Sequence, residues 1–180
     1  MAPSEPITVL ERSICYRGLA EAFRSPAGGV GILDESWIPP PSKNAKTEFL
    51  EAFEPAVSKT ACALYQSAHS SREQTSLYEE LIRWYDHFGL QRKAKAELPD
   101  HVSVELEFMH FLTYREHVSA GDENALIILR RAEKEFLTKH LHPFSVSISG
   151  HSETFANRYR YLCLEHEMFV RQHLEDFGEI

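Results

Sequence analysis

SSREQTSLYEELIRWYDHFG, residues 70–89, has the spacing of an amphipathic helix and decides the fold class predicted for the chain. Its large apolar side chains recur at intervals of three and four residues, which places them on one helix face: Leu77, Leu81, Trp84, Tyr85 and Phe88. Ser70 and Glu73 form a capping-box pattern at the start, and Gly89 is a typical helix stop. The stretch predicts a helix with one face packed against a core.

The same spacing extends over most of the chain, and no sustained alternation typical of β-strands appears. Helices are predicted at about residues 6–24, 46–68, 70–89, 100–118, 121–143 and 152–177. Pro55 should break or kink the second helix, and His142-Pro143 should end the fifth. Asp100 and Ser152 are the predicted N-caps of the fourth and sixth. The expected fold is all-α, with about six to seven or more helices.

The length and composition fit one globular domain over residues 1–180. A chain of 180 residues can bury roughly 70% of its unfolded surface in a single core. Its 43% apolar and 26% charged residues are typical of a folded protein rather than a disordered one. Residues 25–44 are rich in glycine and proline and form a predicted long loop within the domain, with one helical turn near residues 32–37.

Charge and cysteine content argue against several classes of protein. The formal net charge of −8, from 19 basic and 27 acidic residues, disfavours nucleic acid as a partner. The three cysteines are far apart and odd in number, so no complete disulfide framework forms and a reducing compartment is expected. The first residues lack a signal-peptide pattern, and no apolar run reaches the ~20 residues of a membrane span. We therefore expect a cytoplasmic protein without membrane insertion.

His166 and His173 lie on the apolar stripe of the last predicted helix, with Cys163 three residues before His166. Such side chains can hold a metal or a haem, but histidines on an apolar stripe are more often hydrogen-bonded core residues. No other ligand cluster completes a metal site, so neither metal nor cofactor is expected. Phosphate-loop, dinucleotide-binding and nucleophile-elbow motifs are also missing, which predicts a non-enzyme. A haem- or metal-binding sensor using these histidines, and a small enzyme with a site built from scattered residues, remain as alternatives.

The segment Glu97-Leu98-Pro99-Asp100-His101 places two acids, a rigid proline and an imidazole where a loop meets a helix. From the residues alone, the simpler interpretation is a helix N-cap. Together with the helix of residues 104–109 and the later block of residues 136–144, FLTKHLHPF, the segment resembles the signature blocks of the redox-enzyme maturation chaperones of the TorD/DmsD/NarJ type. Residues 16–26 and 77–85 are similar to two further helices of that family. The proline directly before Asp100 is similar to nitrate-reductase-type members, and the continuation of the helices looks closest to chaperones of type II dimethyl sulfoxide reductase family enzymes.

This resemblance implies a helical chaperone that binds the apo form and the twin-arginine leader of a molybdopterin-containing catalytic subunit. Such a chaperone assists cofactor insertion and delays export until the enzyme is mature. The family offers no catalytic residues, and the resemblance implies this partner-binding set: Trp84, Tyr85, Glu97, Pro99, Asp100 and His101. The protein is expected to be a monomer or a weak dimer, and domain swapping through the loop of residues 25–41 is one way to form that dimer.

Overall fold

The computed structural model describes residues 7–24, 26, 41–91 and 96–178, whose regular structure is helical apart from one isolated antiparallel bridge between Tyr65 and His101. The α-helices are α1 (Val9–Arg24), α2 (Ala45–Phe53), α3 (Gln74–His87), α4 (Val102–Val118), α5 (Glu123–Phe136), α6 (His142–His151) and α7 (Asn157–Glu175). The all-α prediction is confirmed. The helical turn predicted near residues 32–37, with most of the predicted loop, lies outside the described residues.

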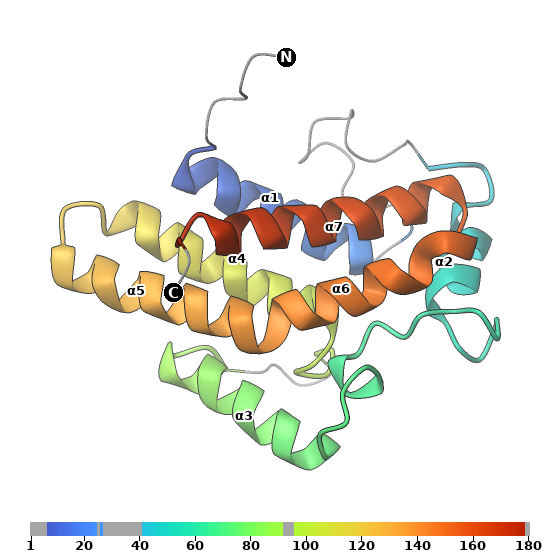
Figure 1. The fold of residues 1–180 in the computed structure, drawn as a ribbon, viewed down its shortest axis with the longest axis horizontal. Helices are drawn as coiled ribbons and strands as arrows, with labels where there is room; N and C mark the ends of the chain where they lie inside the picture. Colours follow the sequence, from blue (N-terminus) through green and yellow to red (C-terminus); the bar gives the residue numbers. More distant parts are fainter. Residues whose placement is uncertain (1–6, 25, 27–40, 92–95, 179–180) are drawn as a thin grey trace.

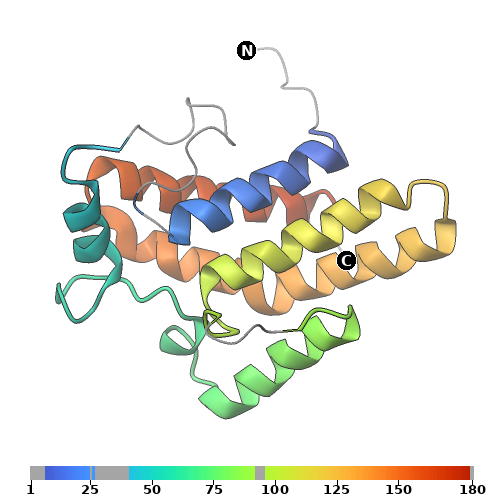
Figure 2. The ribbon, with the colours of Figure 1, turned by 180° about the vertical axis from the view of Figure 1, so that it is seen from behind.

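Five of the helices, α1, α4, α5, α6 and α7, form the main bundle, while α3 lies along one side of it and α2 at one end (Figure 1). Helix α1 packs along α4, and α6 packs along α7. The view from behind shows α4 between α1 and α5, with α3 again set apart from the bundle axis (Figure 2). None of the described helices combines the length and apolar character needed to cross a membrane.

Aromatic side chains from most of these helices fill the core. The largest fully buried ones are Tyr16, Phe23, Phe108, Phe136, Phe144 and Tyr159. Aromatic rings of this size each remove roughly 150–250 Å² from water, so they dominate the energy of packing. The predicted stripe of α3 also faces inward, because Leu77 and Leu81 are fully buried.

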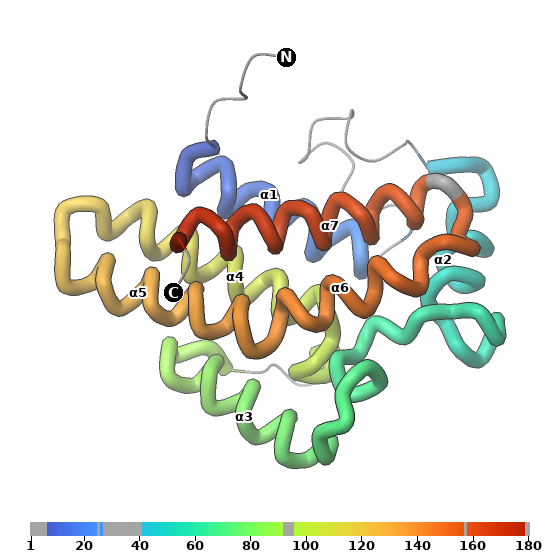
Figure 3. Tube along the Cα trace, in the orientation of Figure 1, coloured from blue at the N-terminus to red at the C-terminus, as the bar shows by residue number. Residues whose placement is uncertain are grey.

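A π-helical turn, Leu137–Leu141, connects α5 directly to α6, so the two helices form one nearly continuous rod (Figure 3). The predicted helix end at His142-Pro143 is therefore wrong. Pro143 lies in the first turn of α6, where the missing N–H of proline matters least. The wider π turn before it accommodates the change of hydrogen-bond pattern.

The helix predicted over residues 46–68 is much shorter in the structure. It ends at Phe53, and Glu54 has an extended backbone with φ −109° and ψ 102°. A residue before proline disfavours the helical conformation, so Pro55 stops the helix rather than bending it. Only a short 3₁₀ turn, η1 (Gln66–Ala68), follows before α3.

Two predicted caps are also displaced. The Glu73 carboxylate, rather than Ser70, caps α3, accepting hydrogen bonds from the backbone N–H groups of Thr75 at 3.0 Å and Ser76 at 2.7 Å. It satisfies two free donors of the first turn, so the helix begins at Gln74. Ser152 begins a 3₁₀ turn and does not cap α7, which starts at Asn157.

Candidate functional site: a pocket between α3 and α4

The segment of residues 97–101 is held in place by a short antiparallel pairing with the chain before η1. The backbone N–H of Val102 donates to the Leu64 carbonyl at 2.9 Å, and that of Gln66 donates to the Asp100 carbonyl at 2.8 Å. The Asp100 side chain adds a third link, because its Oδ2 accepts a hydrogen bond from Ser67 N at 3.0 Å. The segment is therefore positioned by residues more than thirty positions earlier in the chain.

His101, not Asp100, is the N-cap of α4. Its Nδ1 accepts a hydrogen bond from Ser103 N at 3.2 Å, while the Asp100 carboxylate is engaged with Ser67 and is completely buried. Burial lowers the pKa of His101, against the opposing effect of Glu97 and Asp100. A neutral imidazole has a free lone pair, which is what capping requires. The prediction that Asp100 caps this helix is wrong because its carboxylate is used in the pairing with residues 64–67.

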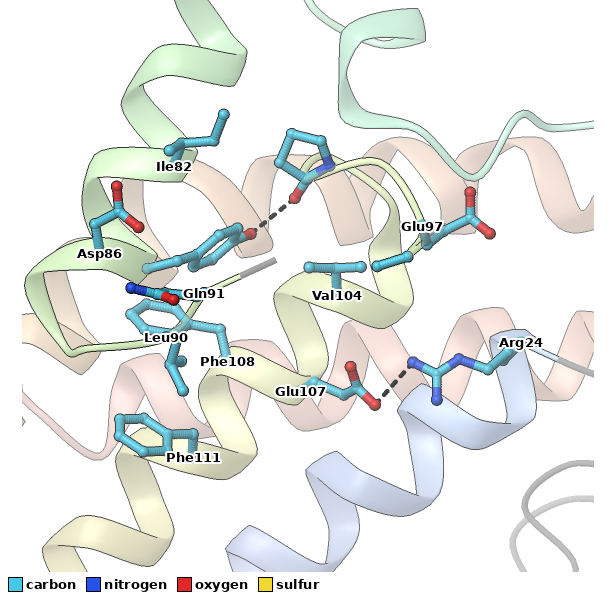
Figure 4. Close-up of a pocket in the computed structure, with 13 residues that line it drawn as sticks. Arg24, Ile82, Asp86, Leu90, Gln91, Glu97, Val104, Glu107, Phe108 and Phe111 are labelled. Atoms are coloured by element: carbon cyan, nitrogen blue, oxygen red, sulfur yellow. Dashed lines mark hydrogen bonds and ion pairs between the residues drawn. The ribbon is translucent and has the colours of Figure 1, made fainter. Parts of the chain in front are cut away.

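A pocket of about 680 Å³ opens beside this segment. Its residues come from α3 and the chain after it, from α4 and the chain before it, and from the end of α1 (Figure 4): Arg24, Ile82, Tyr85, Asp86, Leu90, Gln91, Ala96, Glu97, Pro99, Val104, Glu107, Phe108 and Phe111. The walls are largely apolar. Three carboxylates, Asp86, Glu97 and Glu107, lie on different sides of them.

Tyr85 ties α3 to the proline of the segment. Its hydroxyl donates a hydrogen bond to the Pro99 carbonyl at 2.8 Å, and its ring packs edge-on against Phe108 with centroids 5.0 Å apart. Burial raises the pKa of Tyr85 well above its ordinary value, so the hydroxyl keeps its proton and remains a donor. The opposite side of the segment is held by the Tyr65 hydroxyl, which donates to Glu97 Oε1 at 3.0 Å.

Among the described residues that line the pocket, the charge is predominantly negative. Arg24 at the end of α1 pairs with Glu107 at 2.8 Å, and both side chains are about half exposed. Asp86 is exposed at the end of α3. Apolar walls beside exposed carboxylates suit a ligand that combines apolar side chains with cationic groups, because guanidinium groups pair with carboxylates through two parallel hydrogen bonds.

The sequence matches the family described as "Nitrate reductase delta subunit" over residues 29–148, which is most of the chain. The chain belongs to this family. The selenate reductase assembly chaperone protein of Thauera selenatis is 33% identical over 132 residues, covering 70% of this chain and 68% of that protein. The perchlorate reductase assembly chaperone protein of Dechloromonas aromatica is 33% identical over 130 residues, 71% of this chain and 56% of that protein. The chlorate reductase assembly chaperone protein of Ideonella dechloratans is 29% identical over 132 residues, 70% of this chain and 68% of that protein.

These matches confirm the resemblance to redox-enzyme maturation chaperones. In this member of the nitrate reductase delta subunit family, three of the six predicted partner-binding residues line the pocket: Tyr85, Glu97 and Pro99. Asp100 and His101 lie behind it, fully and almost fully buried. Trp84 lies outside the lining and packs against Phe108 and Phe136, with ring centroids 6.3 and 5.8 Å away.

Several lining residues escaped the sequence prediction. Asp86 lies four residues after Ile82 on α3, and Glu107 and Phe111 lie three and seven residues after Val104 on α4, so helical spacing was a usable signal for them. Nothing in the sequence placed Arg24 beside α4, because that contact depends on how α1 and α4 pack.

The two histidines weighed as metal or haem ligands lie in the core. His166 is fully buried, and its ring meets that of Phe23 edge-on at 5.1 Å. His173 Nδ1 lies 2.7 Å from the Tyr16 hydroxyl, and its Nε2 lies 3.4 Å from Glu133 Oε2. His173 fits the interpretation as a hydrogen-bonded core histidine, whereas His166 lies in the core with no hydrogen-bond partner for either ring nitrogen among the described residues.

Proposed function

We propose that this chain is an assembly chaperone for the catalytic subunit of a molybdopterin-containing redox enzyme. It binds the apoprotein and its twin-arginine leader, keeps the client available for cofactor insertion and delays export, without catalysing a reaction. Because the leader must be bound before export, the chaperone acts in the cytoplasm. The observation that carries this proposal is the pocket that joins apolar walls to Asp86, Glu97 and Glu107 beside the segment of residues 97–101.

The chemistry of a twin-arginine leader matches that pocket. An export leader offers an apolar stretch and two neighbouring guanidinium groups, so it needs apolar contact area and carboxylates close together. Apolar contacts would come from Ile82, Leu90 and Phe111, and carboxylates from Asp86 and Glu97. A leader arginine can also take the place of Arg24 on Glu107, an exchange that leaves no carboxylate unpaired.

Within this proposal the six predicted residues have three different roles. Tyr85, Glu97 and Pro99 contact the leader. Asp100 and His101 position the segment from behind, and Trp84 fixes α3 against the bundle. The net charge of −8 favours encounter with a cationic leader, and salt should weaken that steering.

The test is calorimetric titration of the full chain with a synthetic client leader. Asp86→Asn removes a pocket carboxylate and should weaken binding about tenfold, since one charge-assisted hydrogen bond is worth roughly 1.5–3 kcal/mol. Glu79→Gln is the matched control, because Glu79 is exposed on the same helix and pairs only weakly with Arg83, at 3.9 Å. A leader with both arginines replaced by lysine should also bind less tightly. If Asp86→Asn and Glu79→Gln bound the leader equally well, and the wild type bound the arginine and lysine leaders equally well, this pocket would be ruled out as the leader site.

A further inference from the structure

A second group of side chains, which could bind a metal ion, includes Cys62 in the chain that pairs with the start of α4. Cys62, His69 and His151 each offer one ligand atom, and these three atoms lie within 4.8 Å of one another. They come from separate parts of the chain: Cys62 from the loop after α2, His69 from the residue after η1, and His151 from the last residue of α6. Their proximity is therefore a product of the tertiary fold.

The spacing of the two inner ligands fits a tetrahedral cation. Cys62 Sγ and His69 Nε2 are 3.7 Å apart. Zinc binds thiolate sulfur at about 2.3 Å and imidazole nitrogen at about 2.0–2.1 Å, which separates the two ligand atoms by about 3.6 Å at the tetrahedral angle. A zinc ion can thus bridge these atoms with little movement of either side chain.

Ser147 on α6 holds both imidazoles by their other nitrogen. Its hydroxyl lies 2.7 Å from His69 Nδ1, and its carbonyl lies 2.8 Å from His151 Nδ1. When Nδ1–H donates to these oxygens, each Nε2 keeps its lone pair free to bind a metal. Metal-binding histidines are oriented in this way by hydrogen bonds from the nitrogen that does not bind the metal.

We propose that Cys62, His69 and His151 bind one divalent cation of the zinc type. Three protein ligands leave one position for water. In the metal-free protein the His69 Nε2–H donates a hydrogen bond to the Ala63 carbonyl at 2.7 Å. On metal binding the ring changes tautomer through exchange of its proton with solvent, and its Nδ1–H donates a hydrogen bond to the Ser147 hydroxyl. The Cys62 thiol loses its proton to solvent and becomes the thiolate ligand.

Binding of the cation releases the Cys62 thiol proton, so affinity rises with pH. His151 is exposed, which gives the cation a route to the buried thiol.

Such an ion would fasten the chain after α2 to the end of α6. Cys62 lies two residues before Leu64, whose carbonyl accepts the Val102 N–H at the start of α4. The site would thus stabilise the strand-like pairing that positions residues 97–101. This metal site differs from the sequence-based expectation of no metal, because that expectation considered only the histidines of the last helix. The proposed site does not depend on the proposed chaperone activity.

The full chain, kept reduced with a phosphine that does not chelate, is stripped with chelator and titrated with zinc against a chromogenic chelator and with cobalt by absorption. We expect one equivalent of zinc, a thiolate-to-cobalt charge-transfer band, and a higher melting temperature with zinc. His151→Gln should weaken zinc binding at least tenfold and abolish most of the thermal shift. His117→Gln, an exposed histidine in the last turn of α4, is the matched control and should bind like the wild type.

Since His151 is exposed, His151→Gln should fold and melt like the wild type without metal, and its binding result is then a direct test. The proposal is overturned if the stripped wild type takes up no zinc, if bound cobalt shows no thiolate band, or if His151→Gln and His117→Gln bind zinc equally. None of these results would bear on leader binding at the α3–α4 pocket.

Discussion

His166 is a polar side chain buried in the core without a polar partner among the described residues. It is fully buried, and neither ring nitrogen has a hydrogen-bond partner within the part of the chain that the structure describes. Burial alone lowers its pKa to about 3, so the imidazole is neutral at physiological pH. Burying a polar group without a partner lowers the free energy of unfolding by roughly 1–3 kcal/mol. His166 therefore stabilises the fold through its packing contacts but not through a hydrogen bond.

Replacement by leucine should therefore make the protein more resistant to acid. The folded pKa of His166 lies below the ordinary value of 6.5, so the unfolded chain binds a proton first as the pH falls. Stability is lost from about pH 6.5 downward by up to about 1.4 kcal/mol per pH unit, and His166→Leu removes that loss. Urea denaturation at pH 7, 6 and 5 measures it. His166→Ala removes the same titration but leaves a cavity, so it should be less stable than His166→Leu at every pH, by about 2 kcal/mol or more. Parallel pH profiles for the wild type and His166→Leu would show that the core histidine does not control acid stability.

At the scale of elements, helix faces were predictable, and so were the C-terminal ends of α1 and α4, whereas the N-caps of α3, α4 and α7 were not. The stripe of α3 and the burial of His166 and His173 follow from apolar spacing, which depends only on residues nearby in sequence. Helix ends depend on competition between neighbouring capping groups. Asp100 and His101 are adjacent candidates, and the choice between them is set by Ser67, far earlier in the chain.

The residues that line the pocket show the same difference between local and tertiary information. Tyr85, Glu97 and Pro99 were predicted because they belong to motifs that are contiguous in sequence. Arg24 was missed, since its place at the pocket follows from the packing of α1 against α4. The partner of His173 was likewise unpredictable, because Tyr16 lies 157 positions away.

The junction between residues 64–67 and α4 gives a prediction at this scale. Asp100→Ala leaves the Ser67 N–H without its acceptor and should destabilise the fold by roughly 1–3 kcal/mol. Asp100→Asn keeps an oxygen acceptor and should melt close to the wild type. Leader affinity per folded molecule should be unchanged in Asp100→Asn, because the carboxylate has no exposed surface. Thermal melts and leader titrations measure the two effects. Normal melting with a tenfold loss of affinity would instead place Asp100 in contact with the leader.

On the scale of the whole molecule, a buried acid lies where four helices meet. Glu133 of α5 is completely buried, with His173 of α7 at 3.4 Å. Burial raises its pKa to about 8, the carboxylate of Glu116 on α4 adds to this, and the positive charges of Arg12 on α1 and Arg130 oppose it. The packing of the bundle therefore favours the protonated form of this one side chain near neutral pH.

The contribution of Glu133 to stability should consequently fall as the pH rises from about 4.5 to about 8. The folded pKa of Glu133, about 8, lies above the ordinary 4.5, so its stabilising effect is complete below pH 4.5 and is lost as the pH rises through 8. Between pH 6.5 and 8 unfolding releases this proton, and the free energy of unfolding falls by up to about 1.4 kcal/mol per pH unit. Glu133→Gln does not titrate and should give a flatter profile in urea denaturation across this range. Glu135→Gln, on the same helix and paired with Lys139 near the surface, should keep the wild-type slope. If Glu133→Gln also kept that slope, Glu133 would be ionised in the folded protein, and the junction of α1, α4, α5 and α7 would have to accommodate a buried charge.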